Sequence, residues 1–213
     1  MLENLNSEEI KSQFKTNKKL RMITFAVGGL IVLVIGFFLY RQFIVKPKNE
    51  KSQDAYWVGM NYAGKDSTEV AIEELKKVVK KYNGYSGGEN AQFLLGGQLM
   101  KKGEYKKAIE ALEDVDVSDT YVSAMAIGMQ GDCYSELGNF KKAVELYVEA
   151  SEKNKNEMTT PMYLFKAGLN AEELKDFEAA TGFYQTIKDD YVTFANRKVI
   201  DKYLARASSQ KAK

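Results

Sequence analysis

Three neighbouring residues could do chemistry: Asp132, Cys133 and Glu136 lie within the stretch GDCYSELG. A cysteine nucleophile needs a base that generates its thiolate, and that base is usually a histidine. The chain has no histidine and only one cysteine. Asp132 and Glu136 could act as a carboxylate pair one helical turn apart, but such pairs are common on helix surfaces. We therefore predict no catalytic residue, no cofactor and no metal site, and we expect Cys133 to be a small apolar core residue.

The composition favours a helical, membrane-associated protein. The 213 residues are 45% hydrophobic and 28% charged, with two prolines, which suits one membrane anchor and one modest helical domain. Residues 1–53 carry nine Lys or Arg against four Asp or Glu, whereas residues 54–213 carry 22 against 25. A nucleic-acid-binding domain normally has a basic surface. We therefore predict no nucleic-acid partner, and no small-molecule substrate.

Residues 22–40, MITFAVGGLIVLVIGFFLY, have no charge. As a helix they span about 28 Å, close to the ~30 Å hydrocarbon core of a bilayer. A core helix would have a polar face, and a cleaved signal peptide would end in small residues instead of FFLYRQF. The sequence predicts a retained single-pass transmembrane helix after a short basic tail, residues 1–21.

Five Lys or Arg precede this span closely and four follow it. The positive-inside rule therefore favours a cytoplasmic amino terminus by one charge, which places the larger carboxyl-terminal domain on the opposite side of the membrane. Residues 41–53, RQFIVKPKNEKSQ, are expected to form a polar tether broken by Pro47.

A pattern of small and large residues recurs along the rest of the chain. In each copy a glycine is followed 12 residues later by an alanine and four residues after that by a large apolar residue. The copies are Gly96/Ala108/Leu112, Gly131/Ala143/Tyr147 and Gly168/Ala180/Tyr184, with a degenerate one at Gly59/Ala71/Leu75. An aromatic follows the glycine by nine residues in three copies, at Tyr105, Phe140 and Phe177. The period of 35 or 37 residues is typical of stacked helix pairs.

The residue types suit such a stack, because small residues let two antiparallel helices approach closely and aromatics fill the space between them. The pattern resembles the tetratricopeptide repeat, a helix–turn–helix unit, over residues 54–191. The resemblance implies an all-α solenoid of antiparallel helix pairs. Residues 192–213, which place Phe194, Ile200 and Tyr203 near one face, are expected to form a carboxyl-terminal capping helix.

The first helices of such pairs line the concave side of the solenoid. The side chains expected there, which we call the predicted groove, are apolar and rich in methionine: Tyr56, Met60, Phe93, Met100, Met125, Met162, Phe165 and Leu169. Two interpretations stay open. These residues are either ordinary interhelical core or a binding groove for apolar segments of other proteins.

The layout of anchor, tether, one degenerate repeat and three clear ones, together with TTPMYLFKAGLNAEEL, resembles the bacterial membrane-anchored tetratricopeptide proteins related to YfgM, an ancillary subunit of the SecYEG translocon. The resemblance implies a single-pass protein of the bacterial inner membrane with its repeat domain in the periplasm. It also implies a non-enzymatic protein-interaction module that assists secreted proteins, with translocon subunits, periplasmic chaperones or unfolded clients as partners. Two alternatives are a self-associating scaffold for envelope assembly and a cytosol-facing module like an import receptor.

Overall fold

The computed structural model describes residues 7–115, 117 and 119–211. These residues are helical throughout, apart from turns and short connections, and they form two compact units, Met1–Lys48 and Asn49–Lys213. The all-α prediction is confirmed.

The first unit contains two helices joined by one residue. They are α1 (Ser7–Thr16) and α2 (Lys18–Tyr40), so 14 residues of the predicted basic tail are helical, while residues 1–6 lie outside the described part of the chain. No residue of α2 is buried. The helical stretch Lys18–Gly64, which includes α2, is long and apolar enough to cross a membrane, a property that signal sequences share.

The expected break of the tether at Pro47 is wrong, because residues 41–53 are helical. A π-helical turn, η1 (Arg41–Val45), leads directly into α3 (Lys46–Gly64). Pro47 lacks an N–H group, and its ring would collide with the carbonyl four residues earlier in a regular α-helix. The wider π turn just before it relieves this collision, so the proline does not end the helix.

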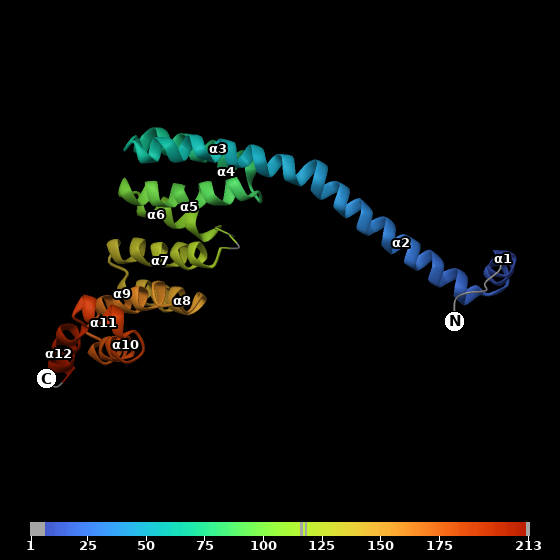
Figure 1. Cartoon of the computed structure of the whole chain (residues 1–213). Helices are drawn as coiled ribbons and strands as arrows, with labels where there is room; N and C mark the ends of the chain where they lie inside the picture. The colour runs from blue at the N-terminus through green and yellow to red at the C-terminus, as the bar shows by residue number, and fades with distance from the viewer. Residues whose placement is uncertain (1–6, 116, 118, 212–213) are drawn as a thin grey trace. The chain divides into compact units, whose positions relative to one another are not determined.

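The second unit is a stack of helix pairs in chain order (Figure 1). The pairs are α3 with α4 (Thr68–Tyr82), α5 (Ser86–Lys101) with α6 (Tyr105–Glu113), α7 (Thr120–Glu136) with α8 (Phe140–Lys153), and α9 (Thr159–Glu173) with α10 (Phe177–Asp190). The last two helices are α11 (Val192–Lys198) and α12 (Ile200–Lys211).

The repeated glycines occupy equivalent places in the four pairs. A Cβ atom built on Gly59, Gly96, Gly131 or Gly168 would come within 3.0 Å of the side chain 16 residues later in the paired helix. The partners are Leu75, Leu112, Tyr147 and Tyr184. The alanines between them, at positions 71, 108, 143 and 180, are completely buried. The small residues therefore mark the helix crossings, as the spacing predicted.

The large residue at each crossing is the one 16 residues after the glycine. The aromatics nine residues after the glycine were expected to fill the space between the paired helices, and the structure corrects this expectation. Tyr105, Phe140 and Phe177 are each the first residue of a second helix, and all three are only partly buried. Tyr105 packs against the first core cluster. An aromatic at the start of a helix lies at the edge of the crossing, because the crossing itself is two turns further along.

The turns inside the four pairs also share one geometry. The residue seven positions after each crossing glycine has a left-handed backbone, with φ of 57° at Asp66, 79° at Gly103, 75° at Gly138 and 60° at Lys175. Its N–H and the next one donate to carbonyls in the last turn of the first helix, for example Gly103 N to Met100 O (2.9 Å) and Glu104 N to Leu99 O (2.9 Å). This arrangement ends a helix with its carbonyls satisfied.

The predicted capping helix is two helices. Val199, with φ of 54°, separates α11 from α12, and a left-handed residue cannot continue an α-helix. The change of direction brings Ile200 and Ala207 of α12 into the same core cluster as Phe194 of α11 and Ile187 of α10. The two helices together cover the last pair.

Candidate functional site

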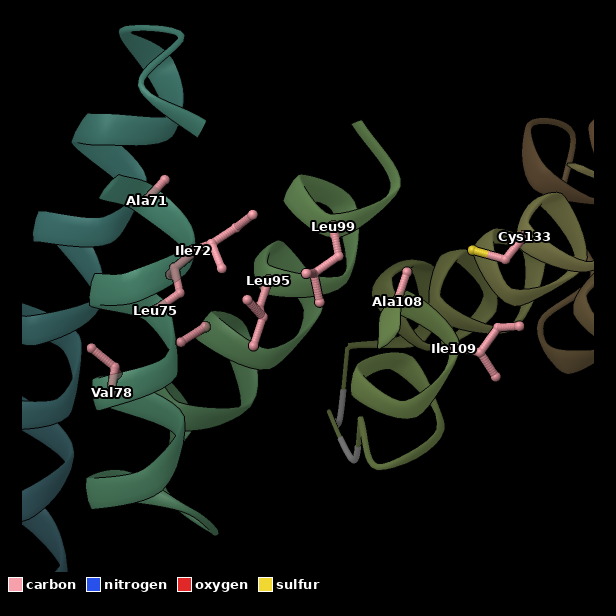
Figure 2. Close-up of a cluster of buried hydrophobic side chains, with 10 residues drawn as sticks. Ala71, Ile72, Leu75, Val78, Leu95, Leu99, Ala108, Ile109 and Cys133 are labelled. Carbon is pink, nitrogen blue, oxygen red and sulfur yellow. The ribbon is translucent and has the colours of Figure 1, made fainter. Parts of the chain in front are cut away.

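Cys133 lies inside α7 and is completely buried. Its sulfur points toward α6, beside Ala108, in the core cluster that joins α4 to α7 (Figure 2). Burial, together with the nearby carboxylates of Asp132 and Glu136, raises the pKa of the thiol to about 12. The thiol stays protonated at neutral pH and has no route to solvent, so Cys133 acts as a packing residue.

Asp132 is held in a network that joins three helices. The Tyr147 hydroxyl of α8 donates to Asp132 Oδ1 at 2.7 Å, and Lys166 Nζ of α9 donates to both carboxylate oxygens at 2.6 and 2.8 Å. Lys166 also lies over the rings of Tyr147 and Tyr163, 5.7 and 5.8 Å from their centroids. The carboxylate is thus neutralised and immobilised, which suits a connection between repeats better than acid–base catalysis.

A hollow of about 390 Å³ opens beside this network. Its lining combines apolar, hydroxyl and charged side chains: Met100, Lys101, Tyr105, Asp132, Ser135, Glu136 and Tyr147. Lys101 pairs with Asp66 at 2.5 Å, and Tyr105 donates to Glu136 Oε2 at 3.4 Å. The hollow therefore has a preformed wall with the exposed carboxylate of Glu136 at its edge. A pocket with these walls can receive a side chain with an apolar stem and a polar end.

The eight residues of the predicted groove all lie on the first helices of the pairs. Tyr56 and Met60 are on α3, Phe93 and Met100 on α5, Met125 on α7, and Met162, Phe165 and Leu169 on α9. Met60 is 38% exposed, and the other seven are partly buried. Met100 is the member that also lines the hollow. Partial burial on every first helix leaves both interpretations of the predicted groove possible for the set.

Phe165 has a packing role of its own at the end of the stack. Its ring lies 4.8 Å from that of Tyr203 in α12 and 6.4 Å from that of Phe194 in α11, both edge to face. Tyr184 of α10 is 6.1 Å away. Aromatic pairs at these separations stabilise beyond the area that they bury. The terminal helices therefore cover this part of the predicted groove.

We expect Phe165→Ala to lower the free energy of unfolding by about 2 kcal/mol, less than for a fully buried phenylalanine. The same change at the exposed Met60 should lower it by less than about 0.5 kcal/mol. Chemical denaturation followed by circular dichroism measures both, and hydrogen exchange should become faster in α11 and α12 of the Phe165 variant alone. Equal small effects at the two sites would show that Phe165 does not hold the terminal helices.

Sequence reasoning missed the ion pairs that link successive pairs of helices. Asp66 with Lys101, Asp132 with Lys166, and Glu172 with Arg206 are 35, 34 and 34 residues apart, and their N–O distances are 2.5, 2.6 and 2.6 Å. Each separation equals about one repeat. An acid followed by a base one period later would have been a usable signal. Among the described residues, no three His, Cys, Asp or Glu side chains lie close enough together to hold a metal ion.

Comparison with known proteins supports the repeat. A family model for the tetratricopeptide repeat matches residues 126–156, which include Gly131, Ala143 and Tyr147. No curated protein matches the chain.

Solved structures share the fold at low sequence identity. MamA (residues 41 to the end) from Desulfovibrio magneticus RS-1 is 20% identical, with a TM-score of 0.54 over 65% of this chain and 74% of that one. The apo form of RapI is 21% identical, with a TM-score of 0.61 over 96% and 67%. The TPR-like repeats of a putative kinesin light chain from Podosopora anserina are 15% identical, with a TM-score of 0.58 over 77% and 88%. The chain therefore has the tetratricopeptide-repeat fold after a long apolar amino-terminal helix.

Proposed function

We propose that this protein is a membrane-tethered protein-interaction module. The proposal rests on the hollow beside Met100 and Glu136, on the side of the predicted groove. The mixed apolar and polar lining of this hollow suits a protein side chain better than a small apolar ligand. The apolar helix α2 supports a membrane tether by length and composition. A tether raises the local concentration of the module at the membrane, so weak contacts in the groove are enough to retain a partner there.

The specific role that we propose is assistance to secreted proteins near the translocon, with the repeat domain in the periplasm. This follows from the resemblance in layout to the YfgM-related proteins and from the charge distribution around α2. Partners in this proposal are translocon subunits, periplasmic chaperones or unfolded clients. Affinity purification of the full chain from solubilised membranes should enrich at least one translocon subunit or envelope chaperone. Enrichment of neither class would refute this specific role and leave the general module standing.

A photocrosslinking amino acid in place of Met100 tests the groove directly. In intact cells it should form adducts with other proteins, and a second change, Glu136→Gln, should weaken adduct formation by basic partners at least several-fold. The matched control is the same crosslinker at Val70, which is exposed on the second helix of the first pair. Equal adduct patterns from positions 100 and 70 would contradict a specific binding site at the hollow.

A self-associating scaffold is the second candidate, and the outer face of α3 favours it. Val58 and Tyr62 are 47% and 39% exposed, whereas the equivalent Leu95 and Leu99 of α5 are only 6% and 2% exposed. The two leucines are covered because α4 precedes them, and no helix pair precedes α3 in the stack. A stable dimer in sedimentation experiments that dissociates on Val58→Glu would favour the scaffold.

The third candidate is a cytosol-facing module, which differs only in the side of the membrane on which the stack lies. Protease treatment of intact cells and of spheroplasts separates the two. The periplasmic proposal expects the carboxyl terminus to be protected in intact cells and cleaved in spheroplasts. Protection in both preparations would reverse the proposed orientation.

A further inference from the structure

The first unit contains a helical hairpin at the start of the apolar span. Asn17 is the only residue between α1 and α2, and its side chain accepts hydrogen bonds from the N–H groups of Lys19 and Leu20 at 3.0 and 3.1 Å. An asparagine in this position starts a helix by satisfying its free N–H groups. The rings of Phe14 and Phe25 meet edge to face at 6.0 Å. The turn and the ring contact together hold α1 against the beginning of α2.

Between the two helices lies a second hollow, of about 400 Å³. Phe14, Leu20 and Thr24 supply most of its wall, and Lys11 and Lys15 complete the lining. The two lysines are one turn apart on α1, so their ammonium groups lie on the same side of that helix. The hollow thus combines an apolar wall with a pair of cations.

The charged residues that line this hollow have one sign. From residue 11 to residue 21 the chain has five Lys or Arg and no Asp or Glu. Lys11 and Lys15 are exposed, and no ion pair joins either of them to an acid in the described part of the chain. A ligand with a negative charge at one end and a hydrocarbon chain at the other would match both the cations and the apolar wall.

We infer that this hollow binds an anionic phospholipid, with the phosphate beside Lys11 and Lys15 and an acyl chain along Phe14 and Leu20. The inference rests on the proposed membrane anchoring, because the hollow lies where α2 would enter the bilayer and where lipid phosphates are concentrated. A bound lipid would also hold α1 along the membrane surface. A soluble phosphate compound satisfies the two lysines equally well but leaves the apolar wall exposed to water.

The test uses the full chain reconstituted with phosphatidylcholine alone or with an equal mixture of phosphatidylcholine and phosphatidylglycerol. Native mass spectrometry then counts the lipid molecules that the wild-type chain and each variant retain. The wild-type chain should retain phosphatidylglycerol selectively. The double variant Lys11→Gln/Lys15→Gln should bind it about 25-fold more weakly, about fivefold for each lysine removed. The matched control, Lys18→Gln/Lys19→Gln, removes the same charge from residues that do not line the hollow and should lose less than threefold.

Four outcomes would overturn the inference. Equal losses in the two double variants would mean general attraction of a basic segment, without a site. Competition by glycerophosphoglycerol, which has no acyl chains, as strongly as by the lipid would mean a soluble phosphate ligand. Insertion of the wild-type chain into the mixed vesicles without selective retention of phosphatidylglycerol would refute the site and leave the anchor intact. Failure to float with either kind of vesicle would refute the anchor and the site together.

Discussion

Gly96→Val is expected to lower the free energy of unfolding by about 3 kcal/mol. Gly96 lies where α5 crosses α6, and a Cβ built on it would be 2.5 Å from Leu112 Cγ. Leu112, on α6, is itself buried, so its side chain has no free space into which it could move. The two helices must therefore separate, and the contacts along the whole crossing weaken.

The neighbouring Gly97 provides the control, because it is on the same turn of the same helix. A Cβ there meets only the terminal methyl group of Met129, at 3.4 Å, and that flexible side chain can move aside. Gly97→Val should therefore change the free energy of unfolding by less than about 0.5 kcal/mol, since valine and glycine differ little in helix propensity. Urea denaturation followed by far-ultraviolet circular dichroism measures both variants. Similar destabilisation by the two would mean that the crossing does not depend on a small residue at position 96.

Alkaline pH should unfold the protein through its buried phenols. Burial raises the pKa of Tyr147, Tyr163 and Tyr184, and nearby carboxylates raise it further. In the unfolded chain these groups lose their protons near pH 10, whereas the folded protein keeps them. Stability is therefore complete below that pH and falls as the pH rises, by about 4 kcal/mol for the three tyrosines together at pH 11. Cys133, with its pKa raised to about 12, adds a loss in the same direction from about pH 9.

Thermal unfolding at pH 7, 9, 10 and 11 measures this loss, and Tyr184→Phe identifies its source. The variant keeps the buried ring and removes one of the three phenols, so the loss between pH 9 and pH 11 should be smaller by about 1.4 kcal/mol. Replacing an exposed tyrosine, Tyr121→Phe, should leave the profile unchanged. A wild-type melting temperature that stays constant up to pH 11 would contradict the proposed burial of these hydroxyls.

The helix crossings could be predicted from the sequence because each one depends on residues of a single repeat. Gly131, Ala143 and Tyr147 are spaced so that a helix, a turn and a second helix bring them together, and no other part of the chain is needed. The burial of Cys133 was also predicted, although it depends on the preceding pair, because Cys133 packs with Ala108 and Ile109 of α6.

The features that could not be predicted depend on how one repeat is placed on the next. Asp132 is neutralised by Lys166 from the following pair, and Phe165 is covered by Tyr203 from the last helix. Position in the repeat alone assigns Phe165 to the groove, whereas the packing of the terminal helices decides how much of it a partner could reach. The sequence did not predict that residues 41–53 are helical or that Val199 separates α11 from α12. A proline tolerated after a π turn and a valine with a left-handed backbone both go against residue preferences.

The two ends of the stack differ in what could be added to them. At the amino-terminal end, Trp57, Val58 and Tyr62 leave α3 with an uncovered apolar side. At the other end, the exposed residues of α12 are mostly polar, including Lys202, Ser209 and Gln210. A duplicated helix pair inserted ahead of α3 would find a surface to pack on, and one appended after α12 would not. Gene duplication could therefore lengthen this protein only from its amino-terminal end.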